Sequence, residues 1–158
     1  MVEPRNTFSI AVMPGDGVGM ETVKATLPVL DVLSAERGYR FDLDDIPCGG
    51  HYYHEHGVEW PEGSFERVKK ADAILLGAVG HEDEQGRTVL REDGELAGYE
   101  MVIGMRLKLD LYANVRPVRL FEGVPHSIHG EHRQVWDSSK VDMVIVRENT
   151  EEAYVPGS

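Results

Sequence analysis

The sequence predicts an α/β fold in which a mostly parallel sheet is flanked by helices. Two compact apolar runs, residues 8–13 and 73–77, have the composition of strands that are buried on both faces. Two stretches with helical spacing, residues 20–33 and 60–70, lie between them. Because parallel strands need a crossover connection, this alternation of strands and helices indicates a parallel sheet.

The first half of the chain has clear element boundaries. Residues 8–13 run into a proline-glycine turn, which is typical of a buried strand that ends abruptly. The helix at residues 20–33 has one apolar face, since leucine and valine recur three or four residues apart. Residues 39–44 alternate between apolar and charged side chains, so we expect a strand with one wetter face. Pro61 suits the first turn of the second helix.

The second half of the chain begins with a long charged segment. Residues 80–98 are charged and punctuated by glycine, which predicts a surface loop whose acidic residues are solvated. Helical character returns at residues 100–108. Residues 111–118 and 141–146 are predicted strands, and a turn-rich connection at residues 118–140 joins them.

The composition excludes two classes of partner. The chain has 158 residues and a formal net charge of -12, which would repel a nucleic acid backbone. No apolar run approaches the length that spans a bilayer, and the N-terminus lacks a signal-peptide pattern. The single cysteine, Cys48, cannot form an internal disulfide. We therefore expect a cytoplasmic protein that binds neither nucleic acid nor membrane.

A glycine-rich turn at residues 15–19 lies between a predicted strand and a predicted helix, where a dinucleotide-binding loop would lie. Its glycine spacing departs from the G-x-G-x-x-G pattern, and Asp16 would repel a phosphate. The pattern therefore favours an ordinary strand-to-helix turn over a Rossmann loop.

Histidine and carboxylate side chains gather just after Gly49 and Gly50, which interrupt the chain. Both kinds of side chain bind zinc, but the H-E-x-x-H spacing of a helical zinc site is missing. The residues of this segment are His51, His54, Glu55 and His56. We interpret the segment as solvated and predict no metal ligand in this chain.

Three arginines are candidate carboxylate-binding residues. Arg147 lies at the carboxyl end of a predicted strand, where open α/β sheets place ligands, and Arg106 and Arg116 lie on other predicted elements. A guanidinium group binds a carboxylate through two parallel hydrogen bonds. Three converging arginines would suit a di- or tricarboxylate, whereas separate positions would make them ordinary surface residues.

Four segments, in this order and at these separations, resemble the family of isopropylmalate, isocitrate and tartrate dehydrogenases, which are metal-dependent β-decarboxylating enzymes. They are MPGDGVG at residues 13–19, GAVG at 77–80, LYANVRPV at 111–118 and VRENTE at 146–151. The resemblance implies the N-terminal half of an isocitrate/isopropylmalate dehydrogenase-like fold, which is not a Rossmann domain. It also implies that residues 1–109 belong to a first lobe and residues 110–158 open a second lobe for substrate binding and dimerisation.

The resemblance implies roles for four residues. Arg106, Arg116 and Arg147 would hold the carboxylates of a 2-hydroxy acid. Tyr154 would donate a proton to the enol that forms after carbon dioxide leaves. A phenol with an ordinary pKa of about 10 suits a proton donor, provided that a nearby cation or base helps it to ionise again.

Two cofactors follow from the same resemblance. NAD would accept a hydride, and a magnesium or manganese ion would polarise the resulting ketone. Val18 and Ala78 match positions near the nicotinamide. The metal-binding aspartates belong to a part of the family sequence that this chain does not match, and the full-length form would be a homodimer.

Substrate choice in this family is implied to depend on the residues four and three positions before Arg106. Here they are Val102 and Ile103, which are apolar. A third carboxylate would need polar partners at this place, so these residues favour an alkyl-bearing malate such as 3-isopropylmalate. Tartrate or D-malate is the alternative substrate.

Three hypotheses remain open for the 158-residue chain. The first is that the chain is the N-terminal half of an NAD-dependent decarboxylating dehydrogenase and is inactive alone. The second is that it is a non-catalytic module that binds a di- or tricarboxylate. The third is that it is a remnant that needs a complementary polypeptide to cover its sheet edges.

Overall fold

The computed structural model describes residues 5–128, 131–133 and 136–150. The chain divides into two compact units, residues 1–105 and 106–158. The predicted lobes, residues 1–109 and 110–158, stay a prediction, because compact units in this chain do not identify the lobes of a longer polypeptide. Each unit is described by itself below.

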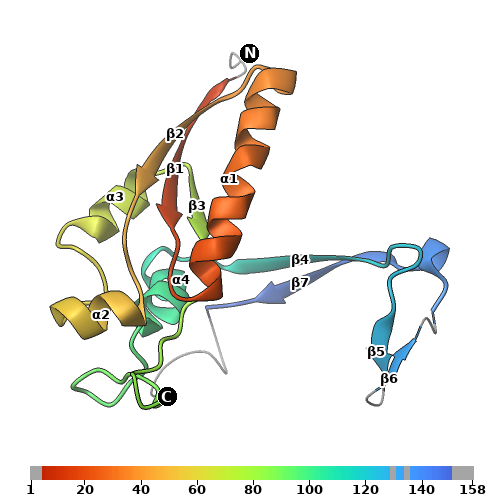
Figure 1. Ribbon diagram of the computed structural model, residues 1–158. Coiled ribbons are helices and arrows are strands. Elements are labelled where there is room, and N and C mark those ends of the chain that lie inside the picture. The colour runs from red at the N-terminus through yellow and green to blue at the C-terminus, as the bar shows by residue number, and fades with distance from the viewer. Residues whose placement is uncertain (1–4, 129–130, 134–135, 151–158) are drawn as a thin grey trace. The chain divides into compact units, whose positions relative to one another are not determined.

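Three parallel strands form the sheet of the first unit (Figure 1). They are β1 (Thr7–Met13), β2 (Arg40–Asp45) and β3 (Ala73–Leu76), in the order β2-β1-β3. All three strands agree with their predicted bounds to within one residue, and the predicted parallel sheet is confirmed. β1 lies in the centre of the sheet, between β2 and β3. Its last four residues are buried, as is typical of a parallel strand that is covered on both faces.

Helix α1 (Val18–Arg37) covers one face of this sheet. It is longer at both ends than the predicted helix at residues 20–33. It ends at Gly38, whose φ of 70° only glycine adopts without strain and whose N–H donates to the Ser34 carbonyl. The core under the helix consists of Ile10, Val12 and Val23, with Leu27, Leu30, Phe41 and Leu75 packed against it.

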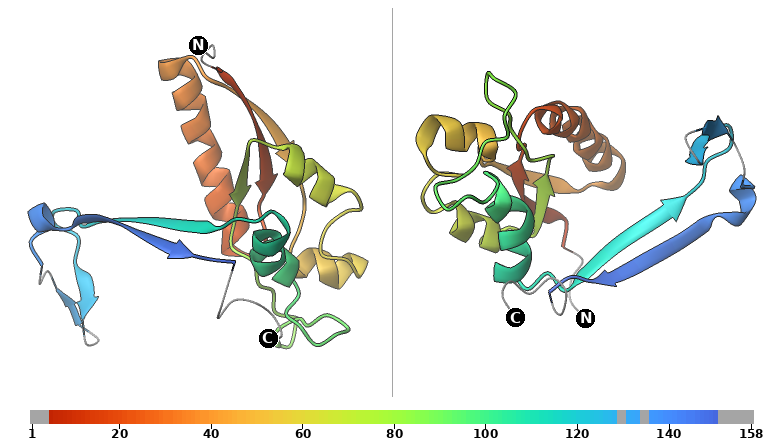
Figure 2. Two further views of the ribbon diagram at one scale, coloured as in Figure 1. Left: turned by 180° about the vertical axis from the view of Figure 1, so that it is seen from behind. Right: turned by 90° about the horizontal axis from the view of Figure 1, so that it is seen from below.

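Two short helices follow β2, and Figure 2 shows them on the side of the sheet away from α1. They are α2 (Gly50–His56) and α3 (Ser64–Lys70). The sequence pattern did not predict α2. A helix was predicted at residues 60–70, and a helix is found there, but it begins at Ser64. The prediction that Pro61 lies in its first turn was therefore wrong. Gly63, with a φ of 78°, interrupts the chain directly before the helix.

The predicted loop at residues 80–98 has little regular structure, with isolated bridges from Glu82 to Thr88 and from Leu90 to Leu96. It leads into a π-helical turn, η1 (Glu100–Gly104), which continues as α4 (Met105–Lys108). The predicted helix at residues 100–108 is therefore confirmed.

The second unit contains an antiparallel ribbon of two strands, β4 (Ala113–Arg119) and β7 (Asp142–Glu148). Both lie close to predicted strands. A hairpin of β5 (His126–Ile128) and β6 (Glu131–Arg133) and a 3₁₀ turn, η2 (Ser138–Lys140), occupy the connection that was predicted to be rich in turns.

Candidate functional site

The carboxyl edge of the parallel sheet is the first candidate site, because ligands of open α/β sheets bind at this edge. The turns at residues 14–17 and 77–80 follow β1 and β3 there. The two turns pack backbone against backbone. A Cβ atom on Gly15 would lie 2.2 Å from the Ala78 carbonyl oxygen, and one on Gly77 would lie 2.0 Å from the Pro14 carbonyl oxygen. Only glycine fits at either position.

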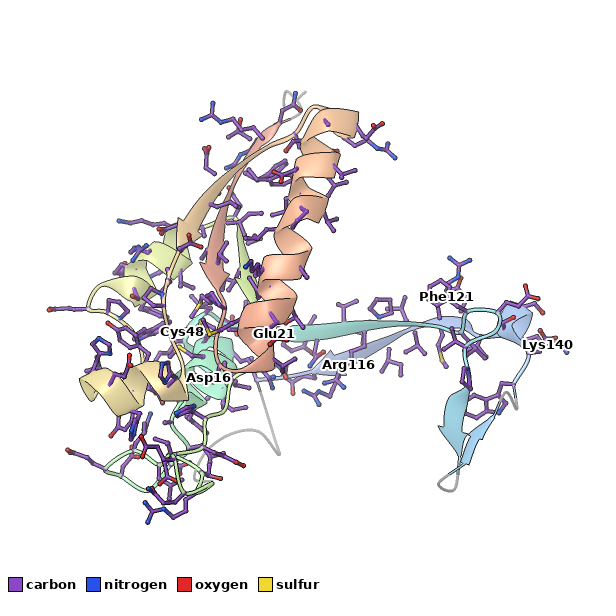
Figure 3. The ribbon with its side chains drawn as sticks, viewed as in Figure 1. Asp16, Glu21, Cys48, Arg116, Phe121 and Lys140 are labelled. Carbon is purple, nitrogen blue, oxygen red and sulfur yellow. The ribbon has the colours of Figure 1, made fainter. Side chains whose placement is uncertain are left out.

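A buried carboxylate, Asp16, ties this edge together (Figure 3). Its Oδ2 atom accepts hydrogen bonds from the backbone N–H groups of Gly50 and Gly80, and its Oδ1 atom accepts one from His51, each at 2.8 Å. Its own N–H donates to the Ala78 carbonyl, also at 2.8 Å. One side chain therefore joins the turn after β1, the start of α2 and the turn after β3.

These contacts satisfy three backbone amides beside the glycine turn, none of which belongs to the turn itself. Gly50, His51 and Gly80 supply backbone amides of the kind that bind phosphate elsewhere, and here the Asp16 carboxylate accepts their hydrogen bonds. From the sequence pattern alone, Asp16 was expected only to repel phosphate. An aspartate inside a glycine turn is the signal that could have indicated this role.

The two residues predicted to lie near the nicotinamide, Val18 and Ala78, belong to this edge of the first unit. Val18 is the first residue of α1 and is 62% exposed, and Ala78 is exposed in the turn after β3. Both present small apolar surface, which is compatible with a ring such as nicotinamide. Their role as cofactor residues stays a prediction.

Cys48 is buried near the same edge (Figure 3). The pKa of its thiol is raised to about 11, chiefly by burial; a backbone hydrogen bond from Gly15 lowers it, and the charges of Asp16 and Glu59 raise it. The thiol is therefore neutral near pH 7 and is a poor nucleophile.

The predicted specificity residues Val102 and Ile103 line one small pocket in the first unit. Its volume is about 280 Å³, and its walls are mainly apolar. The other lining residues are Val79, Gly80, His81, Thr88, Leu96, Ala97, Gly98 and Tyr99. The buried side chain of Met101 anchors the π-helical turn that carries Val102 and Ile103. The structure thus brings both residues to one apolar cavity.

Glu59 and Arg91 hold the charged loop in place, and the sequence pattern indicated neither residue. The buried Glu59 carboxylate accepts hydrogen bonds from the N–H groups of Gly98 at 2.6 Å and Glu100 at 3.2 Å. Arg91 Nη1 lies 3.7 Å from a Glu59 oxygen and 3.8 Å from a Glu100 oxygen. The hydrogen bond from Arg91 holds the pKa of Asp93 below its usual value. The loop is therefore not simply a solvated charge run.

Two of the three predicted arginines share a face of the ribbon in the second unit. Arg147 on β7 is directly opposite Asn114 on β4, and Arg116 is two residues beyond Asn114. Because side chains alternate along a strand, Arg116 and Arg147 are diagonal neighbours, with Cβ atoms about 7 Å apart in this geometry. Arg116 donates to Asn114 Oδ1 and Arg147 donates to Asn149 Oδ1, both at 3.0 Å.

The remaining predicted residues are Arg106 and Tyr154. Arg106 lies in α4, is partly buried and belongs to the second unit, outside the ribbon. Tyr154 lies outside the described residues. The proposed roles of these residues and of the two ribbon arginines stay predictions.

Within residues 5–128, 131–133 and 136–150, no group of three or more histidine, cysteine, aspartate or glutamate side chains is arranged to hold a metal ion. Rings of His51 and His54 lie near that of His81, with centroid distances of 5.0 Å and 6.0 Å. Across the same described part of the chain, no helix is both long and apolar enough to cross a membrane.

The Asp16 network leads to a stability prediction. Asp16→Asn would turn an amide N–H₂ group toward backbone donors and remove charge-assisted hydrogen bonds. We expect it to lower the free energy of unfolding by about 1–3 kcal/mol. Urea unfolding of the 158-residue chain measures this value, and hydrogen exchange should show faster exchange at Gly50, His51 and Gly80.

The control is Asp31→Asn on the exposed side of α1, which should change stability by less than about 0.5 kcal/mol. Equal effects of the two substitutions would contradict the role of Asp16.

Comparison with known proteins gives a consistent result. The model of the family described as "Isocitrate/isopropylmalate dehydrogenase" matches residues 9–157. Tartrate dehydrogenase/decarboxylase from Pseudomonas putida is 35% identical over 152 residues, which cover 96% of this chain and 38% of the relative. 3-Isopropylmalate dehydrogenase from Streptococcus pneumoniae is 35% identical over 145 residues, which cover 92% of this chain and 39% of the relative.

Solved structures show the same similarity. Isocitrate dehydrogenase from Methylococcus capsulatus superposes with a TM-score of 0.65 at 28% identity and covers 93% of this chain and 36% of that chain. A β-decarboxylating dehydrogenase from Thermococcus kodakarensis has a TM-score of 0.51 at 22% identity, over 89% of this chain and 41% of that one, and supports the fold alone. The chain spans about two-fifths of the length of the curated relatives that it matches. On the strength of the family match over residues 9–157, the chain belongs to the isocitrate/isopropylmalate dehydrogenase family of decarboxylating dehydrogenases.

Proposed function

We propose that this chain contributes the N-terminal part of an enzyme that oxidatively decarboxylates a 3-substituted malate such as 3-isopropylmalate, with NAD as the oxidant. The observation that carries the proposal is the apolar pocket of about 280 Å³ lined by Val102 and Ile103. An alkyl substituent gains free energy when such walls remove it from water. A carboxylate there would lose its hydration without a matching partner, which argues against a tricarboxylate such as isocitrate.

Arginines supply the proposed recognition of the carboxylates. Arg116 and Arg147 lie on one face of the ribbon and donate to neutral amide oxygens of asparagines. Two guanidinium groups at this spacing suit the two carboxylates of a malate backbone. We assign Arg106 to the same substrate and Tyr154 to protonation of the enol after decarboxylation. On its own, the chain is expected to be inactive.

The two proposed cofactors differ in how well this chain fits them. The exposed apolar surfaces of Val18 and Ala78 suit the nicotinamide of NAD, which would accept the hydride from the hydroxyl-bearing carbon. Among the described residues, no three or more histidine, cysteine, aspartate or glutamate side chains are arranged to hold magnesium or manganese, so by themselves they do not fit the metal. Its ligands would come from the rest of the family polypeptide. We further propose that the full-length enzyme is a cytoplasmic homodimer.

A second candidate substrate is tartrate or D-malate. The relative from Pseudomonas putida is named tartrate dehydrogenase/decarboxylase and matches this chain as well as the isopropylmalate enzymes do. A third candidate is a non-catalytic module in which the arginines bind a di- or tricarboxylate. Calorimetry on the 158-residue chain distinguishes this module, because it would bind the ligand at micromolar concentration without metal or NAD.

The substrate proposal is tested by joining residues 1–158 to the part of the Pseudomonas putida tartrate dehydrogenase/decarboxylase that follows its aligned segment. NADH formation is measured with manganese and each of 3-isopropylmalate, D-malate, tartrate and isocitrate. We expect the highest kcat/KM for 3-isopropylmalate. A preference for tartrate or D-malate would favour the second candidate. A folded, dimeric fusion that forms no NADH from any of the four would refute the enzymatic proposal.

Ile103→Ala in this fusion tests the pocket. Loss of the larger apolar side chain should lower kcat/KM for 3-isopropylmalate by about 10- to 100-fold, because a few methylene contacts in a pocket are worth about 1–3 kcal/mol. The kcat/KM for D-malate should change little, since D-malate has no alkyl group to place there. Leu90→Ala is the matched control, because Leu90 is exposed and does not line the pocket. Equal losses for both substrates would argue against a specificity role.

Arg116→Lys in the same fusion tests carboxylate binding. Lysine keeps the charge but cannot make the two parallel hydrogen bonds, so kcat/KM should fall by about 10- to 100-fold, which corresponds to a charged hydrogen bond of about 1.5–3 kcal/mol. The control is Arg119→Lys, an exposed arginine on the opposite face of β4. If both variants keep the activity of the parent, Arg116 does not bind the substrate.

A further inference from the structure

A large groove in the first unit has no role in the proposed reaction. Its volume is about 860 Å³, and it is lined by residues 57–65, at the connection from α2 to α3, and by residues 91–93 of the charged loop. Pockets for small organic molecules have volumes of roughly 300–1,000 Å³. The groove shares no lining residue with the apolar pocket of Val102 and Ile103. It is therefore a separate candidate site of suitable size.

Aromatic rings form part of the wall of this groove. The rings of Trp60 and Phe65 have centroids 6.3 Å apart, and their planes are inclined at 55°. The third aromatic lining residue is Tyr53, whose hydroxyl accepts a hydrogen bond from the Glu92 N–H at 3.1 Å. All three aromatic residues are half-buried. The face of an aromatic ring attracts a cation that lies within about 6 Å of the ring centroid.

The charged side chains of the groove are mostly acidic. They are one arginine and five carboxylates, namely Arg91, Glu59, Glu62, Glu92, Asp93 and Glu100. Arg91 lies next to Asp93, Glu59 and Glu100, whereas Glu62 and Glu92 form no ion pair within the part of the chain that the structure describes. The groove therefore repels an anion and attracts a cation.

A buried hydroxyl in the groove wall is an independent sign of a ligand. Ser64 is only 1% exposed, and its Oγ atom has no hydrogen-bond partner among the described residues. Its backbone N–H, in contrast, donates to the Pro61 carbonyl at 3.1 Å. A buried polar atom without a partner costs free energy, and a ligand that binds against this wall can supply the partner.

We propose that this groove binds a small organic cation, in which an alkylated ammonium group is joined to a hydroxyl or similar polar group. The ammonium group lies against the rings of Trp60 and Phe65, and Glu62 and Glu92 balance its charge. The polar group pairs with the hydroxyl of Ser64. An alkylated ammonium ion suits these walls because the rings attract it without having to replace a shell of oxygen ligands.

An inorganic cation fits the groove less well. Such an ion needs several ligand atoms in direct contact, and no group of three or more histidine, cysteine, aspartate or glutamate side chains in the described ranges is arranged to hold one. The proposal does not rest on the proposed function, since the substrate there is an anion and its pocket is a different one.

Titration of the 158-residue chain with choline tests the proposal. The chain has two tryptophans, so Trp136→Phe leaves Trp60 as the single fluorescent indole. The matched neutral probe is 3,3-dimethylbutan-1-ol, which has the shape of choline with carbon in place of the charged nitrogen. At constant low ionic strength, choline should change the Trp60 fluorescence and should bind about 10-fold or more tightly than the neutral probe, because only choline is attracted by the rings and carboxylates.

Two matched double variants locate the site. Glu62→Gln with Glu92→Gln removes two charges from the groove and should weaken choline binding by about 10-fold, with no effect on the neutral probe. Glu21→Gln with Glu36→Gln removes two exposed charges from α1 and should change choline binding by less than about twofold. All four side chains are exposed, so both double variants should fold like the parent, which urea unfolding checks.

Ser64→Ala tests the buried hydroxyl. It should weaken the binding of choline by about 5-fold but leave that of tetramethylammonium unchanged, since only choline carries a hydroxyl group. Equal effects on the two cations would refute the contact with Ser64. Equal binding of choline and its neutral isostere, equal losses in the two double variants, or unchanged Trp60 fluorescence without a heat of choline binding in calorimetry would overturn the proposal.

Discussion

The carboxylate of Asp16 is the interaction on which the first unit most depends. It accepts hydrogen bonds from Gly50, His51 and Gly80, which lie on two different segments after β2 and β3. A buried carboxylate is costly unless hydrogen bonds replace its hydration, and three backbone N–H groups do so here. In consequence, contacts between residues far apart in the sequence hold the carboxyl edge of the sheet, and the exposed Val18 and Ala78 lie at this edge.

A second buried carboxylate, Glu59, organises the end of the charged loop in the same unit. It binds the backbone at Gly98 and Glu100 and pairs with Arg91, so the charged loop is fastened at its end. This matters for the apolar pocket, because the loop and the π-helical turn both contribute to its walls. An acidic chain thus uses carboxylates as internal acceptors as well as solvated surface charges.

The sequence predicted the strands of the parallel sheet well, since apolar runs and turns are local signals. It failed at α2, because Gly49 and Gly50 indicate a break, whereas the start of this helix is held by Asp16, 34 residues away from Gly50. The start of α3 was also misplaced, because the left-handed Gly63 delays the helix beyond Pro61. For the site, a family resemblance pointed to Val102 and Ile103, but no local pattern indicates that both face one cavity.

The sequence by itself determined the α/β class, the order of the main elements and the family, because these depend on periodicity, turn residues and motifs that are local in the chain. Only the tertiary structure decided which arginines share a face, since the register of β4 on β7 puts Asn114 opposite Arg147 and so brings Arg116 to the same side. Pairing between distant segments selects these neighbours, and a linear sequence does not specify that pairing.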